Sequence, residues 1–353
     1  MTSFPNASQS SYHPDTQTYM NSTDWSSPEP NYTWNIYVEA VFLAVIFAIG
    51  CLGNILVMKT TIKVETKFAR QVMTLFFSLA MTDMCVCLFR IGILVYILFH
   101  PTWDNGSIVC VLWFISLALV GIAIWDNFLV GIQRLFIVRA FPVFRKYCTI
   151  PLMISLIVTV VMTQGLVHVC TFLGFDFQLR YDDSQTVCIL QNHTEFAYLF
   201  HKIIVLSTFI GLPFVAAIIC HFLVVHRIVL ACLRRINKVE DRENFIKIIK
   251  TALFRCFLLF LCFAPFLVAS IMDPYHHVIS GQLYRYFDYC ICAHSALSPF
   301  ITLQDADVGD AVPRKTRTSQ NRKNSMTIFN SSIRRIGISV ITSENLKTNK
   351  STE

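Results

Sequence analysis

The sequence predicts an all-α integral membrane protein, a bundle of seven transmembrane helices, and three observations support this fold class. Hydrophobic residues make up 54% of the 353 residues and charged residues only 14%, which departs from the composition of soluble domains. Seven apolar stretches are each long enough to cross a bilayer. The loops between them alternate between rich and poor in Lys and Arg, as loops on opposite sides of a membrane do.

Each apolar stretch is expected to be a helix. A hydrocarbon core about 30 Å thick requires about 20 apolar residues in helical form, because backbone amides find no water there and must bond within the segment. The expected spans are 36–58, 72–99, 108–138, 149–172, 198–229, 246–272 and 283–303. Prolines inside three spans, Pro213, Pro265 and Pro299, predict hinges, with static kinks as the alternative.

The distribution of positive charge predicts the orientation. Residues 1–35 contain no Lys or Arg, whereas the loops after the first, third and fifth spans are rich in both. Basic loops stay on the cytoplasmic side, so the N-terminus is expected outside and the C-terminus inside, in a multi-pass protein of the plasma membrane. The net charge of +7 follows from this bias, and no nucleic-acid partner is expected.

Two polar tails flank a single membrane domain over residues 36–303. The tail over 1–35 is rich in Ser, Thr, Asn, Tyr and Pro and is expected to be disordered. The tail over 304–353 is expected to be disordered and cytoplasmic. Its hydroxyl residues follow basic residues, which predicts docking of receptor kinases and arrestin through added phosphate, and an unmodified tail is the alternative.

Sugar acceptors cluster on the side predicted to be outside. Asn-x-Ser/Thr triplets are a weak signal, because they also occur by chance, as at Asn330 and Asn349 in the predicted cytoplasmic tail. The expected glycosylation sites are Asn6, Asn21, Asn31, Asn105 and Asn192.

Most of the thirteen cysteines lie inside the predicted spans, where a thiol behaves as a small apolar group. Cys110 and Cys188 are the clear candidates for the outer face. A disulfide between them would tie the loop after the fourth span across the mouth of the bundle. Two unpaired cysteines are the alternative.

Several short motifs occur along the chain in a fixed order. They are Gly53-Asn54-Ile55-Leu56-Val57, Leu79-Ala80-Met81-Thr82-Asp83, Trp103 with Gly106 and Cys110, Cys188, Pro213, Cys262-Phe263-Ala264-Pro265, and His294-Ser295-Ala296-Leu297-Ser298-Pro299. Each motif is weak by itself. In this order they resemble the rhodopsin-like G-protein-coupled receptor family, and the chain is identified as a divergent member over residues 36–303.

The resemblance implies a receptor that transduces an extracellular ligand to heterotrimeric G proteins. Carried over motif by motif, it implies switch and coupling roles for Asn54, Asp83, Gln133, Arg134, Phe263, Pro265, Ser298 and Pro299. A carboxyl in mid-membrane is costly, so Asp83 is expected to face the bundle interior, with Asn54 and Ser295 as its partners.

The departures from the family pattern fall on residues that would perform the switching. The third span ends in Gln133-Arg134-Leu135 where the family has Asp-Arg-Tyr, so an ion pair that restrains the arginine at rest is missing, and raised basal activity is expected. The spacing from Cys110 is also one residue short, which leaves either a shortened helix or an imperfect assignment of Arg134. Ser298 and Thr302 replace the asparagine and tyrosine near Pro299, and sodium binding at Asp83 is doubtful.

The resemblance excludes two ligand classes. Leu117 stands where an amine receptor has Asp, and Cys292 stands where a retinal protein has Lys. The remaining candidates for the ligand pocket are Arg90, Leu117, Lys202, Arg285, Asp288 and Cys292. Arg90 in the middle of a span suggests an anionic ligand or, alternatively, an internal pair with Asp288. For Asp126, neither the direction nor a partner can be predicted.

Other functional classes find little support in the sequence. No nucleophile with a base, metal-ligand spacing, phosphate loop or dinucleotide fingerprint is visible, so neither an enzyme nor a cofactor or metal is expected. No repeated halves suggest a channel or transporter. A receptor-like binder or scavenger that does not couple to G proteins remains the main alternative, because of the altered residues at positions 133, 298 and 302.

Overall fold

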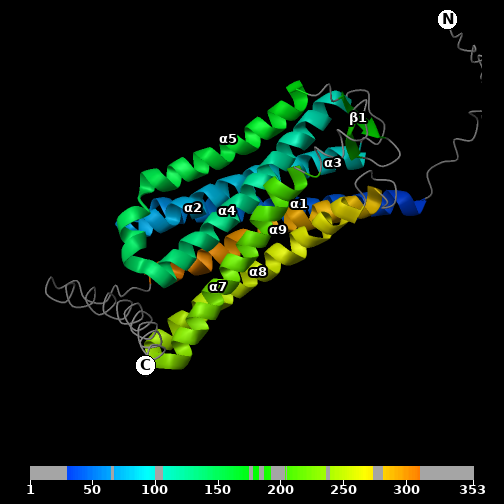
Figure 1. Cartoon of the computed structure of the whole chain (residues 1–353). Coiled ribbons are helices and arrows are strands. Elements are labelled where there is room, and N and C mark those ends of the chain that lie inside the picture. Colours follow the sequence, from blue (N-terminus) through cyan, green and yellow to red (C-terminus); the bar gives the residue numbers. More distant parts are fainter. Residues whose placement is uncertain are drawn as a thin grey trace, which may run out of the picture.

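The computed structural model describes residues 30–64, 67–99, 106–174, 178–182, 187–191, 203, 205–235, 239–272 and 281–310. Within them the fold is an elongated bundle of long helices (Figure 1). The helices are α1 (Pro30–Ile62), α2 (Lys67–Val86), η1 (Cys87–Ile91), α3 (Gly92–Phe99), α4 (Gly106–Tyr147), α5 (Ile150–Gly174), η2 (Val205–Gly211), α7 (Leu212–Arg235), α8 (Val239–Met272) and α9 (Gly281–Asp310). The predicted all-α membrane bundle is confirmed.

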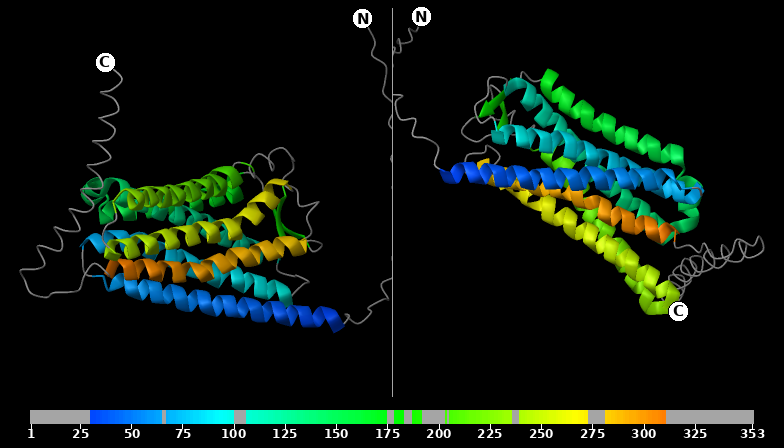
Figure 2. Two further views of the ribbon diagram at one scale, coloured as in Figure 1. Left: turned by 90° about the horizontal axis from the view of Figure 1, so that it is seen from below. Right: turned by 180° about the vertical axis from the view of Figure 1, so that it is seen from behind.

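The helices close into a ring in which α4 contacts several neighbouring helices. Helix α1 packs against α2 and α9, α9 against α8, α8 against α7, and α7 against α4, which also contacts α2 and α5. Helix α5 lies at one edge of the bundle and α8 at the opposite edge, which the view from behind also shows (Figure 2). Most of the described side chains of α5 are exposed, which is expected where lipid rather than protein covers a helix.

Six of the described helical segments are long and apolar enough to cross a membrane. They correspond to the first six predicted spans. Helix α9 does not reach the same apolar content, because its polar residues include Arg285, Asp288 and His294. It nevertheless packs along α1, α2 and α8 as the seventh helix of the bundle.

Two of the spans contain π-helical turns that the sequence did not reveal. The second predicted span is α2, η1 and α3 in direct succession, and η1 is a π-helix, as is η2 at the start of the fifth span. A π-turn inserts an extra residue into a helix and rotates the side chains that follow it. Arg90 lies within η1 and is fully buried.

Several helices extend beyond the predicted spans. Helix α1 begins at Pro30 and α9 continues to Asp310, so residues 30–35 and 304–310, for which the sequence predicts disordered tails, are helical. An apolar stretch marks only the part of a helix that lies in hydrocarbon, and the backbone bonds can continue beyond it. Helix α4 is interrupted at Ala140 (φ −143°, ψ 55°), two residues before Pro142 and close to the predicted end of the third span.

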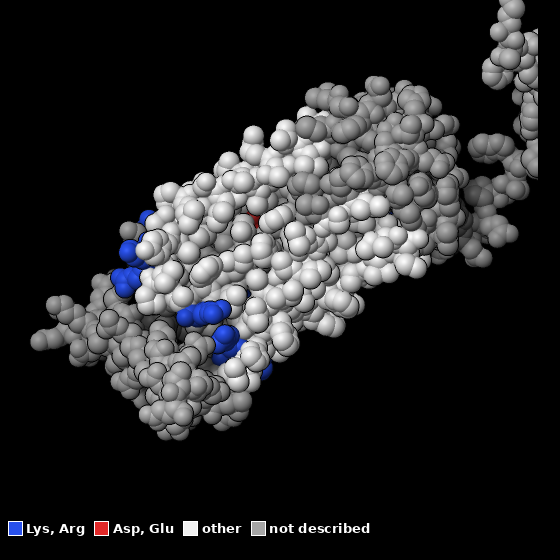
Figure 3. Space-filling model, viewed as in Figure 1, with Lys and Arg blue, Asp and Glu red and all other residues white. Residues whose placement is uncertain are grey.

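The two ends of the bundle differ in charge. Exposed basic side chains gather at one end, called the basic end here, which Figure 3 shows on one face. The basic end is defined by Lys59, Lys63, Arg70, Arg139, Arg145, Lys146 and Lys250. The opposite end carries a hairpin of strands β1 (Gln178–Asp182) and β2 (Val187–Gln191), paired antiparallel with Tyr181 opposite Cys188, and we call it the hairpin end.

One motif glycine sits where two helices approach closely. A Cβ atom added at Gly53 of α1 would lie 2.9 Å from Cβ of Pro299 in α9. The absence of a side chain therefore lets α1 and α9 meet at the level of the seventh-helix proline. Two motifs 246 residues apart in the sequence are explained by this single contact.

Candidate functional site

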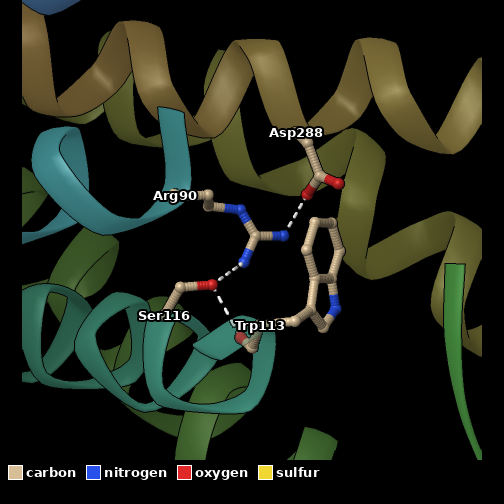
Figure 4. Close-up of polar contacts among 4 residues, drawn as sticks. All are labelled: Arg90, Trp113, Ser116 and Asp288. Carbon is tan, nitrogen blue, oxygen red and sulfur yellow. Dashed lines mark hydrogen bonds and ion pairs between the residues drawn. The ribbon is translucent and has the colours of Figure 1, made fainter. Parts of the chain in front are cut away.

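Polar side chains inside the bundle form layers at different depths. The layer nearest the hairpin end is centred on Arg90, whose guanidinium is held from three sides (Figure 4). Nη1 donates a hydrogen bond to Oγ of Ser116 at 3.0 Å, and Nη2 forms an ion pair with Oδ1 of Asp288. The guanidinium carbon lies 4.3 Å from the ring centroid of Trp113, a cation–π distance.

This layer, Arg90 with Trp113, Ser116 and Asp288, joins the second span to α4 and α9. Arg90 is fully buried and Asp288 nearly so, and the Ser116 hydroxyl in turn donates to the Trp113 carbonyl at 2.6 Å. A buried charge is tolerated only when it is paired and hydrogen-bonded. The internal pair that the sequence left as one alternative for Arg90 is therefore the one present.

The other pocket candidates lie near this layer but have different surroundings. Cys292 is fully buried among apolar residues between α1, α3 and α9. Leu117 is partly buried. Arg285 lies 3.7 Å from Oε2 of Glu39, which also accepts a hydrogen bond from Tyr289 at 2.7 Å. Arg285 thus belongs to a contact between α9 and α1.

The middle layer contains two buried carboxyl groups, Asp83 and Asp126, both fully buried. Asp126 faces inward and accepts hydrogen bonds from Ser78 at 3.0 Å and Thr82 at 3.2 Å. Asp83 also faces inward, as predicted. The hydroxyl groups of Ser295 and Ser298 lie beside its carboxyl group.

The prediction that Asn54 is a partner of Asp83 is wrong. The Asn54 amide donates to the backbone carbonyls of Gly50 at 2.9 Å and Ser295 at 3.1 Å, so it links α1 to the backbone of α9. Among the described residues, neither oxygen of Asp83 accepts a hydrogen bond that meets distance and angle criteria. The sequence motif correctly placed both residues in one layer but could not predict which acceptor the amide chooses.

Phe263 and the two prolines occupy the positions that the motifs predict. Phe263 is buried in the central apolar cluster, with His294 at 4.8 Å and Phe214 at 6.5 Å between ring centroids. Pro265 lies inside α8 and Pro299 inside α9. Each removes a backbone donor from its helix and so leaves a point where the helix can bend.

The third layer lies toward the basic end and contains Gln133, Arg134 and Arg255. Gln133 donates to the backbone carbonyl of Gln71 in α2 at 3.1 Å, so its amide engages another helix. Arg134 is buried, and its guanidinium carbon lies 5.7 Å from the ring centroid of Phe76. Arg134 therefore faces the bundle interior.

Arg255 of α8 also points into this third layer and is almost fully buried. Its Nη1 donates to Oδ1 of Asn127 in α4 at 3.3 Å, and its Nη2 donates to Oγ1 of Thr302 in α9 at 3.1 Å. Its guanidinium carbon also lies 5.7 Å from the Phe76 ring, on the same aromatic residue as Arg134. Four helices meet around these two arginines.

A family model described as the seven-transmembrane receptors of the rhodopsin family matches residues 53–301. The chain belongs to this family. The match covers the bundle from the Gly53 motif to just past Pro299, and so includes all three polar layers. No curated protein matches the receptor at a significant level.

Sequence reasoning missed several residues of these layers. Arg255 gave the same signal as Arg90, an arginine inside an apolar span, and could have been singled out on that ground. Asn127 and Ser116 gave no such signal, because a single polar residue in a span does not reveal which way it faces. Trp113 and Glu39 also became visible only through their contacts.

Other predicted residues lie outside what the receptor structure describes. Lys202 and four predicted sugar acceptors, Asn6, Asn21, Asn105 and Asn192, are outside the described residues. Asn31 lies in the first turn of α1, but its side chain is not described. Cys110 lies in α4 and Cys188 in β2, again without described side chains, so the disulfide stays a prediction.

Proposed function

We propose that this protein is a plasma-membrane receptor that passes the binding of an extracellular ligand to heterotrimeric G proteins. Membership of a receptor family supports the receptor role, and that family is not one of enzymes. The N-terminus lies outside in this proposal, because the basic end is then cytoplasmic. The ligand is neither an amine that pairs with an acid at position 117 nor a retinal bound at position 292.

The position of Arg134 is the observation that best supports the coupling proposal. It lies near the basic end of helix α4 and is buried and directed toward Phe76, where a partner entering from the cytoplasm would meet it. Gln133 supplies no acid, and its amide is bonded to the backbone of α2. An arginine without the adjacent acid of the family is expected to reach its coupling position more often in the absence of ligand.

The ligand is proposed to act from the hairpin end. Asp288 neutralises Arg90, so an anionic ligand group would have to displace that carboxylate before it could bind the guanidinium. Lys202, Arg285 and Leu117 remain proposed contacts, together with Asp288 and Cys292. In this proposal, receptor kinases and arrestin act on the cytoplasmic tail, and sugars are attached on the opposite side of the membrane.

The experiment that tests coupling is agonist-free activation of a panel of G-protein sensors, in cells that express the wild type or Arg134→Ala at matched surface levels. Arg139→Ala is the matched control, because Arg139 is an exposed arginine of the same helix. We expect a basal signal that Arg134→Ala lowers and Arg139→Ala keeps. A wild-type signal no higher than that of mock cells would contradict the raised basal activity.

A receptor-like binder that does not couple is the second candidate. One observation favours it. The Thr302 hydroxyl, at the position of the family's tyrosine, accepts a hydrogen bond from Arg255. An equal signal from wild type and Arg134→Ala, together with ligand-induced internalisation, would support this candidate over the coupled receptor.

A further inference from the structure

The part of α8 from Val239 to Pro265, called its inner segment here, contains the buried residue Arg255. The family resemblance assigned no role to this arginine. Arg255 lies ten residues before Pro265, on the side of that proline toward the basic end. Its neighbours Leu253, Phe254 and Phe257 are exposed on the outer face of α8, where lipid would cover them. A guanidinium that points inward from such a helix is costly to bury, so the residues that bond to it are candidates for a functional role.

Those partners belong to two other helices. Asn127 of α4 and Thr302 of α9 each accept one hydrogen bond from Arg255, at 3.3 Å and 3.1 Å. Thr302 also donates to the carbonyl of Ser298, which fixes the orientation of its hydroxyl. The two bonds tie the segment of α8 between Val239 and Pro265 to the centre of the bundle.

The charge of Arg255 also acts within the middle layer. Arg255 interacts electrostatically with Asp83, whose carboxyl group lies beside the hydroxyl groups of Ser295 and Ser298. It acts on His294 as well. A movement of α8 outward would therefore both break two hydrogen bonds and withdraw positive charge from Asp83.

We propose that Arg255 is a positioning residue that holds the inner segment of α8 against α4 and α9 by its bonds to Asn127 and Thr302. Loss of these bonds then lets this segment move away from α4, the helix on which Arg134 lies. This inference rests on the proposed coupling function for its signalling consequence, but not for the movement itself.

The test measures the position of α8 directly. Labels are attached through genetically encoded azido side chains at positions 63 and 246, which are exposed residues near the basic ends of α1 and α8. The distribution of distances between the labels is then recorded by electron paramagnetic resonance in lipid nanodiscs. We expect Arg255→Met to move about fivefold more receptor into a population with longer separation, and Arg255→Lys to fall between Arg255→Met and the wild type.

Matched variants at Thr302 separate the tether from a general loss of structure. Thr302→Val removes the acceptor with little change in volume, whereas Thr302→Ser keeps the hydroxyl. We expect Thr302→Val to shift the distances in the direction of Arg255→Met and Thr302→Ser to keep the wild-type distribution. Lys250→Met controls for the loss of a positive charge on α8, because Lys250 is exposed.

The outcomes distinguish this inference from the proposed function. Unchanged distances in folded Arg255→Met and Thr302→Val would overturn the tether, whatever the G-protein sensors report. Should Arg255→Met fail to fold, the Thr302→Val and Thr302→Ser pair decides alone. Shifted distances without a signal from any sensor would support the tether and overturn the proposed coupling.

Discussion

Two arginines at opposite depths of the bundle are both buried, but their positive charges are stabilised differently. Arg90, toward the hairpin end, is paired with the carboxylate of Asp288, so the charge of the layer is neutralised within it. Arg255, toward the basic end, is hydrogen-bonded to an amide and a hydroxyl, which are neutral acceptors. Breaking a buried ion pair leaves an unpaired charge, whereas neutral acceptors can be exchanged for other polar groups or water at lower cost.

The comparison suggests a division of roles. The outer layer, Arg90 with Trp113, Ser116 and Asp288, joins three elements through a pair that is expensive to separate. The third layer joins α8 to α4 and α9 through hydrogen bonds of Arg255 to neutral acceptors, which cost less free energy to break. A bundle that must move at one end and stay closed at the other requires this asymmetry, and the following predictions test it in order of expected effect.

The largest effect is expected at Asp288. Asp288→Asn keeps the shape of the side chain but leaves the buried charge of Arg90 without a counter-charge, which we expect to cost about 3 to 5 kcal/mol of stability. The double variant Arg90→Met with Asp288→Leu removes both charges and should lose much less. Thermal unfolding of purified receptor measures both, and equal losses in the single and double variants would contradict the pairing.

A smaller loss of stability is expected at Arg255. Arg255→Met removes hydrogen bonds to neutral acceptors, each worth about 1.5 to 3 kcal/mol when the donor is charged, but also removes the cost of burying the guanidinium. The net loss should be smaller than that of Asp288→Asn in the same thermal assay. A larger loss would break the proposed contrast between the two layers.

The next prediction concerns Gln133, in the third layer. Gln133→Glu places a carboxylate next to Arg134 and restores the ion pair that the family pattern contains. We expect the basal G-protein signal to fall about fivefold, the lower end of usual coupling energies. Gln133→Leu, which removes the bond to Gln71 but adds no charge, is the control. A fall of the same size in Gln133→Leu would show that the acid is not the cause.

The smallest effect is expected at the surface of the hairpin end. Tyr289→Phe removes one hydrogen bond to Glu39, and because solvent screens this partly exposed carboxylate, the loss should be about 1 kcal/mol at most. This variant sharpens the comparison, because it shows that not every polar contact near the hairpin end is as costly as the Arg90 pair. A loss as large as that of Asp288→Asn would contradict the assignment of the outer layer to Arg90.

The motifs predicted which span each polar residue belongs to better than they predicted its contacts with other helices. Asp83 was expected to face inward and does, but its expected partner Asn54 bonds to the backbone of α9 instead. The position of Arg90 inside a span predicts an unusual role, with Asp288 as one alternative partner, and the two form the ion pair. The motifs predict no role for Arg255, although it lies inside a predicted span, since no family motif includes it.

The physical reason for this limit lies in the spans themselves. A transmembrane helix is apolar on its lipid face and largely apolar on its protein face, so periodicity identifies the buried side weakly. The direction of Asp126, which could not be predicted, became clear only from its bonds to Ser78 and Thr82 on α2. The π-turn at Arg90 adds a rotation that regular helical spacing cannot anticipate.

By itself the sequence determined that this chain crosses a membrane seven times, where each crossing lies, and to which receptor pattern its motifs belong. These follow from the cost of exposing polar groups to hydrocarbon, which acts locally on each segment. Only the tertiary structure decided that Arg90 pairs with Asp288, 198 residues later, and that Arg255 joins three helices. Such pairs depend on how helices rotate and pack against one another, and that arrangement is settled by all the contacts of the bundle together.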